Sequence, residues 1–237
     1  MKKIIKKILG KRIIKILSLI KNKYIDKYAM KIYSMEGEDV ILKRFLLHRK
    51  NGFYIDIGAH HPYRFSNTFL FYKEGWKGIN IDAMPDSMKL FNRFRKRDIN
   101  LEIGISKKRD ILTYFMFDES ALNGFSTKLS EKYRKCFNNR IIDKKYIRTY
   151  PLKEILNKYL SKNQHIDFMN IDIEGLDFEV LKSNDWDKYK PDFIIIEILK
   201  INLTDVLNDS IYKYLLSKNY ILVAKTRVSC IFKMVEE

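Results

Sequence analysis

Three short apolar segments of the sequence carry acidic residues at their ends, and this pattern limits the fold more than any other feature. The segments are residues 53–57, 78–82 and 166–175. They are rich in β-branched and aromatic residues, which is typical of buried strands. Their acids include Asp56, Asp82 and Asp172. Because open α/β sheets bind ligands at the carboxyl ends of their strands, we expect these three ends to form one crevice.

Helices alternate with strands along the rest of the sequence. We predict helices over residues 40–47, 66–72, 84–95, 152–160, 177–181 and 204–217, strands over residues 99–105, 111–117 and 192–197, and a closing hairpin of residues 220–224 and 229–234. The alternation predicts an α/β fold with a mostly parallel, Rossmann-like sheet, to which the hairpin adds an antiparallel edge. Residues 133–148 are basic and aromatic, and we expect them to be exposed.

The turn after the first strand argues against a dinucleotide cofactor. The G-x-G-x-x-G motif is absent, and the single glycine, Gly58, offers no cradle for a pyrophosphate. Asp82 stands at the end of the second strand, where a carboxylate grips the ribose hydroxyls of nucleotide-like cofactors. A cofactor with an adenosine group but no phosphates fits this pattern better, and S-adenosylmethionine is the common one.

Several further motifs occur in a family-specific order. They are Tyr-Ile-Asp-Ile-Gly-Ala at 54–59, Ser-Asn-Thr at 66–68, Gly-Trp-Lys-Gly-Ile-Asn-Ile-Asp at 75–82, Asn-Leu-Glu-Ile-Gly-Ile-Ser at 100–106 and Asn-Ile-Asp-Ile-Glu-Gly at 170–175. With them the sequence resembles the FkbM-type methyltransferases from about residue 33 to residue 197. Many members continue the first motif with a further glycine, where this chain has His60, His61 and Pro62. The resemblance implies a class I methyltransferase fold, S-adenosylmethionine as cofactor, and a sugar or small-molecule hydroxyl as acceptor, often in surface-glycan or natural-product pathways.

A set of cofactor-binding positions is expected from the strand ends and the resemblance. Asp82 should accept hydrogen bonds from the ribose hydroxyls. Asp56 and Gly58 should shape the pocket around the methionine end, with satisfaction of the Asp56 carboxylate by loop amides as the alternative. Residues 104–105 should pass the adenine ring, and the resemblance places the segment with Glu38 over the cofactor. The full set is Glu38, Asp56, Gly58, Ala59, Asp82, Ala83, Gly104, Ile105 and Asp172.

Methyl transfer to a hydroxyl requires alignment of the reacting groups and removal of the hydroxyl proton. His60 and His61 are the candidate bases because imidazole titrates near neutral pH, and a structural role is the alternative. Asp172 and Glu174, expected on one face of the third strand, could orient the acceptor, bind the cofactor's amino group or act as base. Acids of the loop 118–126 could bind substrate or lie in a solvated turn. The sequence supplies no complete ligand set for magnesium, so we expect no metal.

Positive charge is concentrated at the N-terminus. The chain has a net charge of +17, and the first 27 residues contain ten of its 46 lysines and arginines but one acid. Apolar residues recur there at helical spacing, which predicts a basic amphipathic helix within residues 1–30, ahead of a methyltransferase domain at 31–237. Lysines interrupt each apolar run, which argues against a membrane span or a signal peptide. The helix could lie on anionic lipid, or pack on the domain or on another subunit.

Three functions remain open from the sequence. The leading one is an O-methyltransferase for a glycan or small molecule, in the cytoplasm or peripherally at the inner face of the membrane. An RNA methyltransferase is the runner-up, since Arg93, Arg95 and Arg97 lie near aromatic residues, although we do not expect a nucleic-acid partner. A non-catalytic membrane-associated module is the third. The two cysteines are isolated, as expected for free thiols in a reducing compartment, and the sequence does not indicate an oligomeric state.

Overall fold

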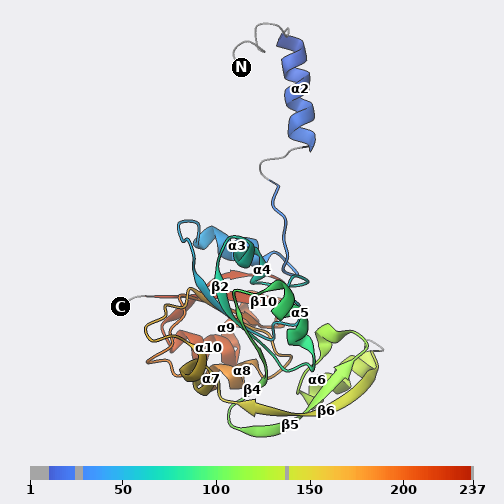
Figure 1. Ribbon diagram of the computed structural model, residues 1–237, viewed down its shortest axis with the longest axis vertical. Helices are drawn as coiled ribbons and strands as arrows, with labels where there is room; N and C mark the ends of the chain where they lie inside the picture. The colour runs from blue at the N-terminus through green and yellow to red at the C-terminus, as the bar shows by residue number, and fades with distance from the viewer. Residues whose placement is uncertain (1–10, 25–28, 137–138, 236–237) are drawn as a thin grey trace. The chain divides into compact units, whose positions relative to one another are not determined.

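The computed structural model describes residues 11–24, 29–136 and 139–235 (Figure 1). It divides into two compact units, Met1–Lys31 and Ile32–Glu237. The first unit contains the helix α2, Lys11–Tyr24. The rest of the predicted N-terminal helix, residues 1–10 and 25–27, lies outside the described residues. Among the helices that are described, none is long and apolar enough to cross a bilayer.

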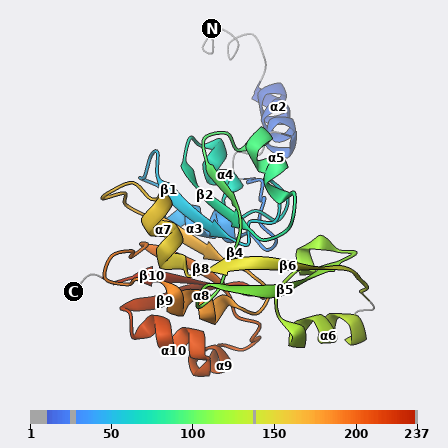
Figure 2. The same ribbon diagram turned by 60° about the horizontal axis from the view of Figure 1, so that its bottom comes forward.

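A sheet forms the centre of the larger unit (Figures 1 and 2). It has seven strands in the order β3-β2-β1-β7-β8-β10-β9. The strands are β1 Phe53–Ile57, β2 Lys77–Asp82, β3 Ile99–Glu102, β7 Phe168–Ile171, β8 Phe193–Glu197, β9 Tyr220–Lys225 and β10 Ser229–Met234. The first five in sheet order are parallel, whereas β10 is antiparallel to both β8 and β9. The predicted mostly parallel Rossmann-like sheet with an antiparallel edge is therefore confirmed.

The strand order reverses between β1 and β7. From β1 the chain builds outward through β2 to β3, and it then returns to the other side of β1 to add β7 and β8. Because the loops that leave β1 and β7 run in opposite directions, they open a crevice at the carboxyl ends of these two strands. This topology places the carboxyl ends of β1, β2 and β7 side by side. The single crevice that was predicted from the acids at these three strand ends is therefore present in the fold.

Helices cover both faces of the sheet (Figure 1). Since side chains alternate along a strand, Ile55 packs in the core with α7, α8, α9 and α10, whereas Tyr54 packs in the core with α3 and α4. Burial on both faces explains why the central strands read as nearly continuous apolar runs. The helices are α3 Glu38–Phe45, α4 Phe69–Lys73, α5 Ser87–Phe94, α7 Leu152–Tyr159, α8 Asp177–Ser183, α9 Leu203–Asn208 and α10 Ser210–Leu216.

A second, three-stranded sheet has the order β4-β6-β5 (Figure 2). Its strands are β4 Gly104–Ile105, β5 Asp110–Phe117 and β6 Ile141–Tyr150, and the short helix η1 Ser120–Leu122 and the helix α6 Thr127–Cys136 connect β5 to β6. The strand predicted over 99–105 is wrong as a single element, because β3 and β4 belong to different sheets. The expected exposure of residues 142–146 agrees with the structure, but they belong to the strand β6, which the sequence did not predict.

One predicted helix, over residues 204–217, is interrupted. The carboxylate of Asp209 accepts the backbone N–H of Ile211 at 2.8 Å and so caps the start of α10. Asn202 caps α9 in the same way, by accepting the backbone N–H of Asp205 at 2.8 Å. Two separately capped short helices therefore replace the single predicted one.

Candidate active site

A cavity of about 630 Å³ lies at the carboxyl ends of β1, β2 and β7. The predicted site residues that line it are Glu38, Asp56, Gly58, Ala59, His60, Asp82, Ala83, Gly104, Ile105, Asp172 and Glu174. His61 does not belong to this lining. Its Nδ1 atom accepts the backbone N–H groups of Tyr63 and Arg64, at 3.3 and 3.1 Å, and so organises the loop after β1.

Gly58 joins the three strand ends at one point. Its backbone N–H, and that of Ala59, donate to the carbonyl of Ile81 in β2, at 2.9 and 3.1 Å. Gly58 adopts a φ of +82°, and a Cβ atom added there would lie 1.7 Å from the carbonyl oxygen of Asp172. Only glycine fits this combination of backbone angle and close approach. The backbone that follows the first strand thus passes in close contact with the end of β7.

Asp82 presents a nearly buried carboxylate, 7% exposed, to the cavity. Its Oδ2 atom accepts the backbone N–H of His60 and its Oδ1 atom accepts that of Met84, both at 2.7 Å. Burial raises the pKa of Asp82 to about 6, and the nearby Asp56 and Glu102 carboxylates act in the same direction. Each oxygen of an ionised carboxylate has a further lone pair, so Asp82 can accept additional hydrogen bonds from a ligand.

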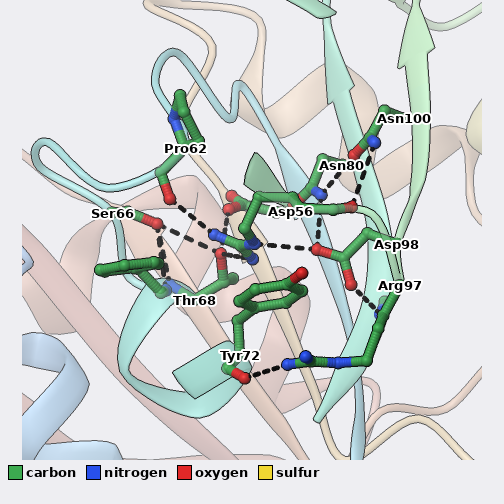
Figure 3. A network of polar contacts seen from close by, with 12 residues as sticks. Asp56, Pro62, Ser66, Thr68, Tyr72, Asn80, Arg97, Asp98 and Asn100 are labelled. Carbon is green, nitrogen blue, oxygen red and sulfur yellow. Dashed lines mark hydrogen bonds and ion pairs between the residues drawn. The ribbon is translucent and has the colours of Figure 1, made fainter. Parts of the chain in front are cut away.

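Asp56 is held by side chains at the floor of the cavity (Figure 3). Its carboxylate accepts the Thr68 hydroxyl at 2.7 Å and the Asn170 amide at 2.9 Å, and Asn170 accepts the Asn67 amide at 2.8 Å. Burial raises the pKa of Asp56, and the two hydrogen bonds oppose this shift. Asp56 therefore ties β1 to β7 and to the 66–68 motif through a hydroxyl and a side-chain amide, in place of the loop amides considered as the alternative.

Arg95 extends the same network and is fully buried. Its Nε atom donates to Asp98 at 2.9 Å, Nη1 donates to the carbonyl of Pro62 at 2.9 Å, and Nη2 donates to Tyr54 Oη at 2.6 Å. Nη2 also donates to Thr68 Oγ1, at 3.0 Å. The interpretation of Arg95 as a nucleic-acid contact is wrong, because a side chain with no exposed surface cannot meet a phosphate in solvent.

Three carboxylates meet on the β7–β8 side of the cavity. Each of Asp172, Glu174 and Glu197 has an oxygen within 4.8 Å of one from each of the others. Asp172 is exposed to the cavity, but desolvation by the protein around it, and then the charges of Glu197 and Glu174, raise the pKa of Asp172 well above its usual value. Glu174 does not continue the face of a strand as expected, because β7 ends at Ile171 and Glu174 adopts a φ of +53°. The sequence analysis missed Glu197, although it ends β8 and the same strand-end pattern could have found it.

The spacing of these three carboxylates could hold a metal ion, and within the described residues a second group, of two acids and a histidine, has similar spacing. It consists of His165, Asp167 and Asp192, at the opposite ends of β7 and β8. The Arg49 guanidinium occupies its centre, with Nη1 2.6 Å from Asp167 and Nη2 2.5 Å from Asp192. This group is therefore an ion-pair network that fastens the chain after α3 to the sheet.

His60 is the histidine that faces the cavity. It has a φ of +52°, and its Nε2 atom lies 3.1 Å from the Ser120 hydroxyl. Burial, together with the charges of Arg64 and His61, lowers the pKa of His60 below the usual value of 6.5. The imidazole is therefore neutral at pH 7, and one of its ring nitrogens can accept a proton.

The loop 118–126 forms the wall of the cavity opposite the sheet. Its acids are engaged elsewhere: Glu119 pairs with Arg64 at 3.1 Å, and Asp118 Oδ1 accepts the backbone N–H of Arg140 at 3.1 Å. The lining comes instead from residues that the sequence analysis did not select, namely Tyr114, Ser120, Ala121, Leu122, Asn123 and Phe125. The Phe125 ring lies close to Gly104, where an added Cβ atom would be 2.9 Å from its Cζ atom. The ring thus packs on Gly104, and Ile105, Leu122 and Phe125 give this side of the cavity an apolar lining.

The sequence matches the methyltransferase FkbM domain over residues 56–222, which is more than half of the chain. The chain belongs to the FkbM methyltransferase family. Most of the cavity lining of this FkbM protein lies inside the matched region, whereas Met35, Glu38 and residues 227–229 lie outside it.

Two solved structures illustrate the likeness of the FkbM protein to other methyltransferases. Methyltransferase FkbM from Methylobacillus flagellatus KT is 15% identical with a TM-score of 0.51, and the match covers 85% of this chain and 48% of that chain. This chain thus spans about half of the Methylobacillus protein. Precorrin-6y C5,15-methyltransferase from Geobacter metallireducens GS-15 is 12% identical, with 90% and 96% of the chains covered and a TM-score of 0.46. No curated protein matches the sequence significantly.

Proposed function

We propose that the protein is an S-adenosylmethionine-dependent O-methyltransferase that acts on a hydroxyl of a sugar or another small molecule. The observation that carries the proposal is the Asp82 carboxylate at the end of β2, which faces a cavity of about 630 Å³ beside the switch point of the sheet. Pockets of this size suit a cofactor together with part of an acceptor. Membership of the FkbM methyltransferase family supports the proposal that the transferred group is a methyl group.

The residues of the cavity fit S-adenosylmethionine in their chemistry. Asp82 retains lone pairs for the ribose hydroxyls, and hydrogen bonds to a charged acceptor contribute about 1.5–3 kcal/mol each. The apolar lining that Ile105, Leu122 and Phe125 contribute suits a flat adenine ring. The three carboxylates Asp172, Glu174 and Glu197 favour a cation, and the methionine end of this cofactor carries a positive sulfonium and an ammonium group.

Bound S-adenosylmethionine supplies an electrophilic methyl group on a positively charged sulfur. An acceptor hydroxyl must lose its proton as its oxygen takes up this methyl, and a positioned base accelerates such a step. His60 can take the proton because it faces the cavity and its lowered pKa keeps the ring neutral near pH 7. The Ser120 hydroxyl at 3.1 Å orients the ring, and the bond from the His60 backbone to Asp82 couples the base to the cofactor end of the cavity.

Calorimetric titration with S-adenosylhomocysteine and S-adenosylmethionine tests the cofactor assignment. Asp82→Ala should weaken binding of both by at least about tenfold, because the ribose hydroxyls lose a charged acceptor. Glu102→Ala is the matched control: this carboxylate ends the neighbouring strand β3 but does not line the cavity, so its removal should change affinity less than threefold or so. Equal affinity of the Asp82 variant and the unmodified chain would disprove the assignment.

Transfer of a labelled methyl group to nucleotide sugars and surface-glycan fragments tests the role of His60. His60→Asn should lower kcat by about 10²–10⁴-fold with the cofactor affinity unchanged, because a general base contributes that much. Asparagine also tolerates the positive φ of this position. His61→Asn preserves an acceptor for the loop N–H groups outside the cavity and should retain most of the activity. Similar losses in the two variants would assign both histidines to loop structure.

A further inference from the structure

We propose that α2 binds the surface of an anionic phospholipid bilayer and lies in the plane of the headgroups. The helix exposes large apolar side chains, with Ile16 55% exposed and Leu17 49% exposed. Ile13 and Ile20 are exposed to a similar extent. Within this unit, four such side chains in 14 residues form an exposed apolar face.

The apolar face and the cations have the arrangement of an interfacial helix. Ile13, Ile16, Leu17 and Ile20 are spaced by three, four and seven residues, so they lie on one side at 3.6 residues per turn. At 3.6 residues per turn, the basic positions of the sequence fall on the opposite side and on both flanks, and they are Lys11, Arg12, Lys15, Lys21 and Lys23. In interfacial helices, basic residues in such positions meet headgroup phosphates while the apolar face enters the acyl boundary.

The charge of α2 favours binding to an anionic lipid bilayer over binding to a second copy of the chain or to a nucleic acid. The helix contains no acidic residue, so a second copy would bring two groups of five cations together at a contact that needs close packing. A nucleic acid would neutralise the cations but leave the isoleucines in water. An anionic bilayer matches both faces at once. The length of the helix, about 21 Å, is shorter than a hydrocarbon core of about 30 Å, which agrees with a helix on the surface.

Cosedimentation of the full chain with vesicles tests the proposal. The probes are phosphatidylcholine vesicles with and without phosphatidylglycerol, in the absence of any methyl donor, so the result does not depend on the proposed enzymatic function. Binding should require phosphatidylglycerol and should weaken as salt shortens the Debye length from about 10 Å at 0.1 M to about 3 Å at 1 M. The double variant Ile16→Ser/Ile20→Ser should bind at least about tenfold more weakly.

Leu19→Ser provides the matched control. Leu19 is 60% exposed, yet it lies among the cations rather than on the apolar face, so its loss should change vesicle binding by less than about threefold. Equal losses in the control and the double variant would overturn the proposal, as would equal binding to uncharged vesicles. A change of oligomeric state in Ile16→Ser/Ile20→Ser, or salt-dependent RNA binding without vesicle binding, would assign the helix to a second copy or to a nucleic acid and would equally overturn it.

Discussion

At the scale of single residues, Asp82 combines two properties that rarely occur together. It is almost fully buried, which raises its pKa to about 6, and it nevertheless remains an acceptor with unused lone pairs. The backbone N–H groups of His60 and Met84 fix its orientation before a ligand arrives. Little orientational entropy is then lost on binding, which is how a single side chain can dominate the affinity of a site.

The pKa of Asp82 should make binding of the proposed cofactor dependent on pH in a narrow range. In the proposed binding mode the ribose hydroxyls donate to the ionised carboxylate, which is present above about pH 6 and is lost as the pH falls through that value. At pH 5 about one carboxyl in eleven is ionised, so S-adenosylhomocysteine should bind about tenfold more weakly than at pH 7.5. Calorimetry across this range measures the effect. Asp82→Asn cannot ionise and should bind weakly with no such dependence; an unchanged slope in that variant would assign the titration to another group.

Gly58 should tolerate no side chain. In Gly58→Ala the new Cβ atom would overlap the Asp172 carbonyl, and φ is +82°, so we expect a loss of about 3 kcal/mol or more in the free energy of unfolding. Gly75→Ala separates the two causes, since Gly75 has a φ of +98° but its nearest neighbouring atom would be 3.5 Å away. In urea unfolding, the loss in the free energy of unfolding should be larger for Gly58→Ala than for Gly75→Ala by at least about 1 kcal/mol. Equal losses would contradict the close approach of Gly58 to the Asp172 carbonyl.

At the scale of elements, Arg95 joins the end of α5 to parts of the chain that are distant in sequence. Its bonds reach Tyr54 in β1, Pro62 in the loop that carries His60, and Asp98 before β3 (Figure 3). Asp98 in turn accepts the backbone N–H of Gly78 in β2, at 2.9 Å. A buried cation thus fixes the loop between β1 and α4 on the side facing away from the cavity.

Removal of the Arg95 charge should show how much this network contributes to the free energy of unfolding. Arg95→Met should lower the free energy of unfolding by about 3–5 kcal/mol, because Asp98 would remain buried without its partner. Arg93→Met changes an exposed arginine of the same helix and should cost less than about 0.5 kcal/mol. Adding Asp98→Asn to Arg95→Met should recover part of the loss if the unpaired charge is its cause. No recovery in urea unfolding would assign the loss to packing.

At the scale of the whole molecule, the sequence predicts those strands and helices whose burial produces a recognisable pattern of apolar residues within the element itself. Strands β1 and β2 are buried on both faces, so their apolar runs locate them to within a residue. Strand β6 was missed because its exposed residues 142–146 include three charged residues and its partners β4 and β5 lie far away in sequence. No local residue marks the change of sheet at Ile103, which continues the alternation of apolar residues begun by Ile99 and Leu101 in β3.

In the candidate site, too, the residues with a local sequence pattern could be predicted, and those placed by distant parts of the chain could not. The strand-end acids Asp56, Asp82 and Asp172 were predictable because topology alone brings parallel strand ends together. The burial of Arg95 was not, because the charged segment around it reads as a surface and its partner Tyr54 lies 41 residues away. The wall contributed by residues 114–125 was likewise not predictable, since its position depends on the pairing of β5 with β6.

The two walls of the cavity belong to two sheets whose strands pair only within their own sheet. The main sheet carries Asp82 through the pairing of β2 with β1 and β3, whereas β5 carries Tyr114 and leads into the loop with Phe125 through its pairing with β6. Substitutions in the second part can reshape the cavity without breaking the strand pairing of the main sheet, except that changes at Glu119 or Ser120 would also remove side-chain contacts with Arg64 or His60. The segment 106–150 can therefore alter one wall of the cavity while the strand ends that carry Asp56, Asp82 and Asp172 keep their positions.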